Sequence, residues 1–189
     1  MVNTQIRQLT STEYYGMMEN GIIREGERVE LISGQVFTMA AKGTRHTLCT
    51  RNLFKQLLVS IGDRADVQSQ DPITLPNNSE PEPDIVIARL REDNYANSHP
   101  SPTDIILAIE VADSSIKFDR EVKAPLYAAA GINEYWIINL IDDRLEIYRQ
   151  PEGNIYTSIE LITPPRSIYL PQFSEISLNI DDFFPTAKT

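Results

Sequence analysis

Apolar and polar residues recur along the chain with two periods, that of a helix and that of a strand. The helical period occurs first near the start of the chain. Thr10 and Glu13 have the spacing of a capping box, and apolar residues follow at helical intervals, which predicts a short helix near 11–19. Between positions 44 and 61 apolar residues recur about every four positions, with basic residues between them. This pattern predicts a longer helix with one buried stripe.

The stretch FDREVKAPLYAAAGI, residues 118–132, predicts a third helix. Gly131 is expected to end it, because glycine readily adopts the left-handed backbone conformation found after a helix. Pro125 is expected near the first turn, where its missing backbone donor costs least.

Alternation with the period of a strand occupies most of the remaining chain. RVELISGQVFTMA predicts a hairpin around Ser33-Gly34, and EYWIINL and RLEIYRQ predict another around Asp142-Asp143. The proline-containing tail, 164–189, predicts an irregular wrap with a last turn near 180–184. Further strands are expected at 72–75, 84–88, 104–111 and, at an edge, 156–163.

The order of these elements predicts a mixed α/β fold built on a largely central sheet. A chain of 189 residues is long enough to bury a continuous core, and we expect one domain over 1–189. The net charge of −10 argues against a protein that coats nucleic acid, because phosphate groups repel an acidic surface. Nucleic acid would therefore have to bind at a local part of the protein surface and not over the whole of it.

Further features of the sequence as a whole indicate the cellular compartment. The single cysteine, Cys49, cannot form an internal disulfide, and no cysteine and histidine residues have zinc-site spacing. The start of the chain has no apolar run of signal-peptide length, and no run of about 18 uncharged apolar residues occurs. These features predict a cytoplasmic protein that does not span a membrane.

Two carboxylates stand out because they lie in predicted strands. Glu110 interrupts the apolar run IILAIEV, where an unpaired carboxylate would be costly, and Asp84 precedes the apolar run IVIA. If the strands are neighbours, both carboxylates can lie at one end of the sheet, where each would raise the pKa of the other unless a cation is present. Mg²⁺ satisfies such a pair, with Mn²⁺ as a substitute, and the backbone carbonyl of Val111 is a natural third oxygen ligand.

A cation on the following helix would complete a site for phosphate chemistry. Lys123 lies thirteen residues after Glu110, from where a long side chain can reach back over the end of the strand. A basic group there would orient the attacking water and stabilise charge on the phosphate. The alternative interpretation is that Lys123 is a solvated helix residue or forms a structural ion pair with Glu110.

Several of these motifs, in order, resemble the Uma2-type proteins of the PD-(D/E)XK nuclease superfamily. They are PEPDIVIA, LAIEVADSS, the helix with D-x-x-x-K, and GINEYWIINL. The resemblance covers nearly the whole chain. It implies a restriction-endonuclease-like core, in which helices flank a mixed central sheet with extra β-hairpins, and a Mg²⁺-dependent phosphodiesterase site.

By this resemblance Asp84 and Glu110 match the two acidic motif residues. Position 112, where the superfamily usually has its lysine, is Ala112, and Lys123 fits the relocated lysine of Uma2-like proteins. Three weaker matches have alternative readings: Glu30 as a further ligand or a solvent-facing strand residue, His46 as a phosphate contact or acid/base or a surface residue, and Asp119 as a partner of Lys123 or a helix cap.

The leading hypothesis is therefore a Mg²⁺-dependent endonuclease acting on nucleic acid, with DNA the expected substrate and a homodimer the expected assembly. Its expected catalytic residues are Asp84, Glu110, Lys123, Glu30 and His46, and its expected metal ligands are Asp84, Glu110 and Val111. A basic stretch, Lys42, Arg45, Arg51 and Lys55, offers a surface for nucleic acid or a solvated helix face. The alternative is an inactive, dimeric binding or regulatory protein with the nuclease fold. A glycosidase would also use two carboxylates but gains nothing from Lys123.

Overall fold

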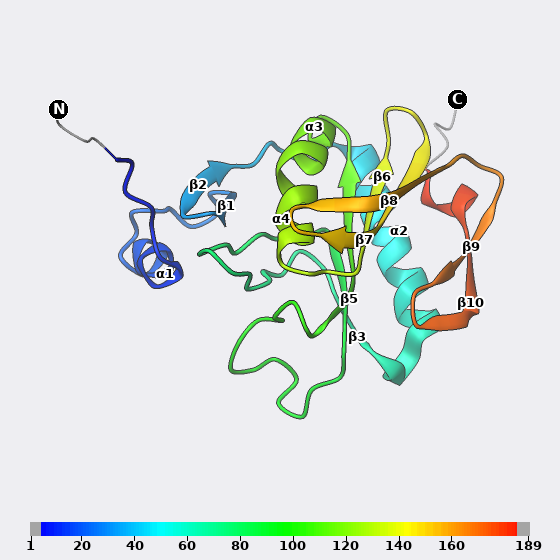
Figure 1. The fold of residues 1–189 in the computed structure, drawn as a ribbon, viewed down its shortest axis with the longest axis horizontal. Helices are drawn as coiled ribbons and strands as arrows, with labels where there is room; N and C mark the ends of the chain where they lie inside the picture. Colours follow the sequence, from blue (N-terminus) through cyan, green and yellow to red (C-terminus); the bar gives the residue numbers. More distant parts are fainter. Residues whose placement is uncertain (1–4, 185–189) are drawn as a thin grey trace.

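A computed structural model describes residues 5–184 and contains a six-stranded sheet at its centre (Figure 1). The strands are hydrogen-bonded in the order β3-β4-β5-β6-β7-β8. β5 and β6 are parallel and the other neighbours are antiparallel, so the sheet is mixed, as predicted. Its strands are β3 (Asp66–Gln68), β4 (Ile85–Ala88), β5 (Ile105–Ala112), β6 (Glu134–Asn139), β7 (Arg144–Glu152) and β8 (Ile155–Ile162).

Helices cover both faces of this sheet. On one face lies α2 (Thr44–Ile61), the predicted long helix, and on the other lies the helical segment 116–129 (Figure 1). Every residue of β5 is buried, as expected for a strand covered on both sides. Alternate residues of β5 face the two layers. Leu107, Ile109 and Val111 pack with the α2 stripe of Cys49, Leu53, Leu57 and Ile61, whereas Ala108 and Ala112 pack with Tyr127 and Ala128.

The helical segment 116–129 contains a π-helical turn in its middle. It consists of α3 (Ile116–Phe118), the π-turn η2 (Asp119–Lys123) and α4 (Ala124–Ala129). Within the turn, the backbone N–H of Ala124 donates to the Asp119 carbonyl. Pro125 stands in the first turn of α4, as predicted, and it directly follows the widened turn, which relieves the clash that a proline ring makes with an ordinary helix. Gly131 has φ +79° just after the helix, as predicted.

A smaller layer precedes the sheet in the chain and lies beside its end (Figure 1). Helix α1 (Ser11–Glu19) has the predicted capping box, and β1 (Val29–Ile32) and β2 (Gln35–Thr38) form the predicted hairpin. Gly34 has φ +74° in the turn, and a Cβ atom there would lie 2.5 Å from the Gln8 Cβ. Only glycine fits this turn, which docks the hairpin on the preceding segment.

Two predictions of secondary structure were wrong. Residues 72–75 form no strand: the N–H groups of Ile73 and Leu75 bond to carbonyls of Pro81 and Ser79 in the same loop. The place beside β4 belongs to β3, whose three residues are too few and too polar to give a clear pattern. The tail is not irregular, because β9 (Ser167–Leu170) and β10 (Phe173–Asn179) form a hairpin.

Pro164 and Pro165 precede β9 and Pro171 lies in the turn between β9 and β10, so these three prolines delimit the hairpin instead of breaking it. Alternate residues Ile168, Leu170, Ile176 and Leu178 join the α2 side of the core. The predicted last turn is the 3₁₀ helix η3 (Ile180–Phe183), and a second 3₁₀ turn, η1 (Gly62–Arg64), follows α2. Residues 185–189 of the tail lie outside the described part. Between residues 5 and 184, no helix is both long and apolar enough to cross a membrane.

Candidate functional site

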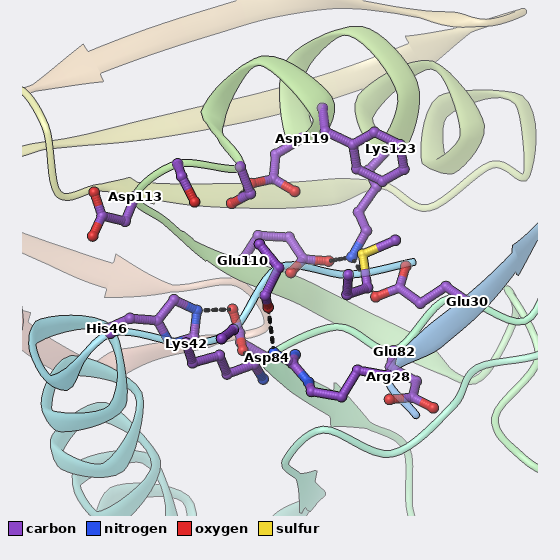
Figure 2. Close-up of a pocket in the computed structure, with 17 residues that line it drawn as sticks. Arg28, Glu30, Lys42, His46, Glu82, Asp84, Glu110, Asp113, Asp119 and Lys123 are labelled. Atoms are coloured by element: carbon purple, nitrogen blue, oxygen red, sulfur yellow. Dashed lines mark hydrogen bonds and ion pairs between the residues drawn. The ribbon is translucent and has the colours of Figure 1, made fainter. Parts of the chain in front are cut away.

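The antiparallel pairing of β4 with β5 brings the two predicted carboxylates together. Ile85 is the register partner of Ile109, so Asp84, just before β4, lies beside Glu110 near the end of β5. The backbone N–H of Val111 donates to Asp84 Oδ2 at 2.9 Å. The conditional prediction that these strands are neighbours is confirmed, and both carboxylates enter one pocket (Figure 2).

Glu110 is 4% exposed and faces the helical segment 116–129. Its Oε1 accepts hydrogen bonds from Lys123 Nζ at 2.8 Å and from the Tyr127 hydroxyl at 3.0 Å. Lys123 Nζ also donates to Glu30 Oε1 at 3.1 Å, so one ammonium joins β1 to β5. The carboxylate that interrupts the apolar strand is therefore paired, as burial requires.

Burial and charge act in opposite directions on this pair. Burial raises the pKa of Glu110 well above its ordinary value, and the Lys123 ammonium opposes that shift. Burial alone would lower the pKa of Lys123, but the carboxylates of Glu110 and Glu30 raise it above its ordinary value. The paired carboxylates therefore favour the charged form of Lys123, which makes it a poor proton acceptor.

Asp84 is held from the other layer of the fold. Lys42 Nζ donates to Oδ1 at 2.9 Å, and His46 Nε2 lies 3.0 Å from Oδ2 (Figure 2). Burial would raise the pKa of Asp84, but the hydrogen bond with His46 and the charge of Lys42 outweigh it and lower that pKa to about 2. Asp84 is therefore ionised at neutral pH.

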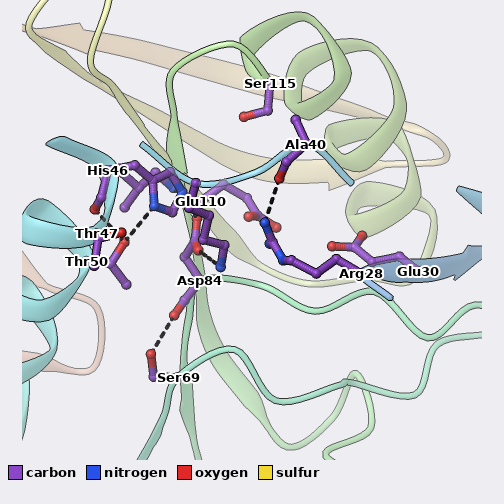
Figure 3. A network of polar contacts seen from close by, with 12 residues as sticks. Arg28, Glu30, Ala40, His46, Thr47, Thr50, Ser69, Asp84, Glu110 and Ser115 are labelled. Carbon is purple, nitrogen blue, oxygen red and sulfur yellow. Dashed lines mark hydrogen bonds and ion pairs between the residues drawn. The ribbon is translucent and has the colours of Figure 1, made fainter. Parts of the chain in front are cut away.

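Supporting contacts hold both His46 and the backbone at Asp84, just before β4. His46 Nδ1 lies 3.5 Å from the Thr50 hydroxyl one helical turn along α2, and the Ser69 hydroxyl donates to the Asp84 carbonyl at 3.1 Å (Figure 3). Gly43, the N-cap residue of α2, lines the pocket, and in the described part of the chain no side chain caps this helix N-terminus. The uncapped N–H groups and the helix dipole add positive potential there.

The pocket has a volume of about 90 Å³ and lies between β1, the loop before α2, the ends of β4 and β5, and the start of the helical segment. Glu30 is 4% exposed, and its Oε2 is buried with no hydrogen-bond partner among residues 5–184. Further lining side chains are Arg28, Glu82, Asp113, Ser115, Phe118 and Asp119.

The donor set of the pocket fits a hard divalent cation. The carboxylate oxygens of Asp84 and Glu110 and the unpartnered Glu30 oxygen are of the type that Mg²⁺ binds, and Mg²⁺ needs only one or two of them beside water. In residues 5–184, however, no three His, Cys, Asp or Glu side chains are grouped as a complete metal site. Two lysines pair with these three carboxylates instead, Lys42 with Asp84 and Lys123 with both Glu110 and Glu30.

The structure brings together the five predicted catalytic residues, Asp84, Glu110, Lys123, Glu30 and His46, all of which line the pocket. Val111 contributes its N–H to Asp84, and its carbonyl as a metal ligand stays a prediction. Asp119 accepts a bond from Ser115 at 2.7 Å, and burial raises its pKa to about 6.

Sequence reasoning missed two contacts of the site, Lys42 with Asp84 and Tyr127 with Glu110. Lys42 was placed only in the basic stretch, which the structure divides. Lys42 enters the pocket, Arg45 binds Asp143 and the Leu140 carbonyl, and the rest of that stretch is exposed. Tyr127 lies four residues after Lys123, one helical turn away, and that spacing was its only signal.

Comparison with known proteins identifies the family of this chain. The model of the Uma2 family, described as "Putative restriction endonuclease", matches residues 12–181. The chain belongs to the Uma2 family. The match includes each of the residues discussed above, and it confirms the resemblance inferred from the sequence motifs.

This Uma2 protein is also similar to a solved structure described as "a putative nuclease belonging to DUF820" from Anabaena variabilis ATCC 29413. The two chains are 19% identical with a TM-score of 0.73, and the match covers 93% of this chain and 97% of the other. The likeness confirms the predicted restriction-endonuclease-like fold, with helices around a mixed central sheet and additional hairpins. No curated protein matches this Uma2 chain.

Proposed function

We propose that this Uma2 protein is a metal-dependent endonuclease that hydrolyses phosphodiester bonds of nucleic acid, with DNA the expected substrate. The observation that carries the proposal is the shared pocket of Asp84, Glu110 and Lys123, at one end of two paired strands. The family description and the similar solved structure support the same class of activity. A homodimer stays the expected assembly, because two active sites in one complex would let it cut both strands of a duplex.

Asp84 and Glu110 would hold Mg²⁺, with the unpartnered oxygen of Glu30 or the Val111 carbonyl as a further ligand. When bound, the ion would lower the pKa of a water molecule and stabilise charge on the phosphate. The hydrogen bonds to Glu110 both reach Oε1, which leaves its Oε2 for a ligand role. Water and a phosphate oxygen would complete the coordination of the ion.

The side chains around the acids have separable roles in this proposal. Lys123 stays protonated and orients the attacking water by donating a hydrogen bond. His46 has Nε2 beside Asp84 and Nδ1 beside Thr50, so we assign it to positioning Asp84 instead of transferring protons. Tyr127 fixes the orientation of Glu110 through its hydroxyl.

The test is cleavage of DNA by the purified full chain with Mg²⁺ or Mn²⁺. Asp84→Asn and Glu110→Gln should each lower the cleavage rate at least a hundredfold, because each removes a carboxylate charge that attracts the ion. Glu121→Gln is the matched control, since Glu121 is exposed and pairs only with the exposed Lys117 among the described residues. Absence of cleavage by the unmodified chain, or equal cleavage by all variants, contradicts the proposal.

A second candidate is a binding protein that has the nuclease fold without the activity. It is favoured by the pairing of both acids with lysines and by Ala112 at the usual lysine position. Calorimetry separates the candidates. An active metal site gives heat of Mn²⁺ binding that Asp84→Asn abolishes, whereas a binding protein gives no such heat.

A further inference from the structure

The pocket contains two lysines whose surroundings differ. Lys123 has a side chain 4% exposed and bonds to two buried carboxylates. Lys42 has a side chain 20% exposed, and its one ion pair in the described part of the chain is with Asp84. Breaking the contacts of Lys123 would leave two acids without their cation, whereas Lys42 can leave Asp84 for solvent or for another anion.

The backbone that carries Lys42 is held in place independently of its side chain. In the loop between β2 and α2, the N–H of Met39 donates to the Arg28 carbonyl at 2.8 Å. Arg28 Nη1 donates in return to the Ala40 carbonyl at 2.5 Å (Figure 3). Because the loop is fixed two residues before Lys42, the flexible part is the four-carbon side chain alone.

The oxygens of Asp84 are divided between their partners. Oδ2 accepts from the Val111 N–H at 2.9 Å and lies 3.0 Å from His46 Nε2, whereas the bond to Oδ1 comes from Lys42. A divalent cation bound to Oδ1 would compete with the Lys42 ammonium for that oxygen, because two positive charges in contact with one oxygen repel each other. The contacts on Oδ2 would not need to change.

We propose that Lys42 is an exchangeable counter-ion: it occupies Asp84 Oδ1 in the absence of metal, is displaced by a divalent cation, and then binds a phosphate oxygen of the substrate. Its displaced ammonium stays beside a pocket that has gained two positive charges. The freed ammonium and the bound cation together attract an anion, and a phosphodiester is the anion of the proposed reaction. The displacement depends only on the pocket, and the phosphate contact rests on the proposed function.

Calorimetric titration of the full chain with Mn²⁺ tests the displacement. Lys42→Met removes the competing cation and should bind Mn²⁺ about tenfold more tightly, since a charge-assisted hydrogen bond of this kind contributes that much or more. Lys42→Arg keeps a cation in place and should bind within about threefold of the unmodified chain. The control, Lys117→Met, removes an exposed lysine whose one described ion pair is with Glu121, outside the pocket.

If Lys42 is a counter-ion, the affinity for Mn²⁺ should rise in Lys42→Met. A merely structural role of Lys42 does not predict such a rise. Unchanged or weaker binding by Lys42→Met, or an equal gain in Lys117→Met, overturns the proposal. Circular dichroism melting shows whether the variants are folded, and Lys42→Gln, which also removes the positive charge and should bind Mn²⁺ more tightly, replaces Lys42→Met in the comparison if Lys42→Met does not fold.

DNA cleavage at saturating Mn²⁺ tests the phosphate contact. Lys42→Met should cleave at least tenfold more slowly although it binds the metal more tightly, and Lys42→Arg should retain most of the rate. Equal cleavage by Lys42→Met and the unmodified chain overturns the phosphate contact. If the unmodified chain cuts nothing, the proposed function fails, and the calorimetric result alone still decides whether Lys42 is the counter-ion.

Discussion

Replacing Lys123 by methionine removes the cation that two buried carboxylates share, while the volume of the side chain is nearly kept. Lys123 Nζ lies 2.8 Å from Glu110 Oε1 and 3.1 Å from Glu30 Oε1, and all three side chains are at most 5% exposed. At an effective dielectric constant of about 20, these attractions amount to about 6 and about 5 kcal/mol. Methionine also escapes the desolvation penalty of the ammonium, which is several kcal/mol.

The net expectation for Lys123→Met is a loss of about 3–5 kcal/mol in the free energy of unfolding at pH 8, as found when one partner of a buried pair is removed. This loss is a large part of the free energy of unfolding of a typical domain, which is about 5–15 kcal/mol. Without the ammonium, burial raises the pKa of Glu110 even further. A carboxyl group with a raised pKa in the folded state destabilises as pH rises through that pKa, so the loss should shrink between pH 8 and pH 5.5.

Urea unfolding at both pH values measures these differences, and a second substitution makes the reasoning specific. Glu110→Gln should stabilise the Lys123→Met protein, because it removes an unpaired buried charge, and destabilise the unmodified protein, in which it breaks an ion pair. An unfolding free energy of Lys123→Met within about 0.5 kcal/mol of the unmodified protein would refute the buried pair. Equal destabilisation by Glu110→Gln in both backgrounds would refute the coupling.

Two further predictions concern neighbouring polar contacts. Burial would raise the pKa of Glu146, but hydrogen bonds from Arg120, Asn139 and Arg144 lower it to about 2, so its stabilisation is complete above about pH 4.5 and is lost as pH falls toward 2. Glu146→Gln should therefore cost on the order of 2 kcal/mol at pH 7 and much less at pH 3 in urea unfolding, and a loss independent of pH would contradict this. Tyr127→Phe removes a hydroxyl that donates to Glu110 and should lower the unfolding free energy by about 1 kcal/mol in the same assay, with no change if that hydrogen bond is absent.

Much of the local structure was predictable because its causes lie within a few residues. The capping box of α1, the turn at Gly34 and the stripe of α2 each depend on neighbours along the chain. Glu110 was also identifiable, since a carboxylate inside an apolar run needs a partner.

Both failures have a common cause, because contacts between segments distant in the sequence decided these structures. Residues 72–75 have the composition of a strand, but the place beside β4 is taken by β3, a shorter and more polar segment. The tail contains prolines that suggest irregular structure, yet its alternate apolar residues pack on the α2 side of the core as β9 and β10. Composition alone does not reveal which segment obtains the partner, because tertiary packing decides.

The sequence by itself determined most of the elements, the family and the two acids of the candidate site. Only the tertiary structure decided the surroundings of those acids: the antiparallel register that sets Asp84 beside Glu110, the reach of Lys123 to Glu30, and the approach of Lys42 to Asp84 across 42 positions. The physical reason is range. Periodicity and turn preferences act between near neighbours, whereas a buried charge is satisfied by whichever distant group the folded layers bring within hydrogen-bond distance.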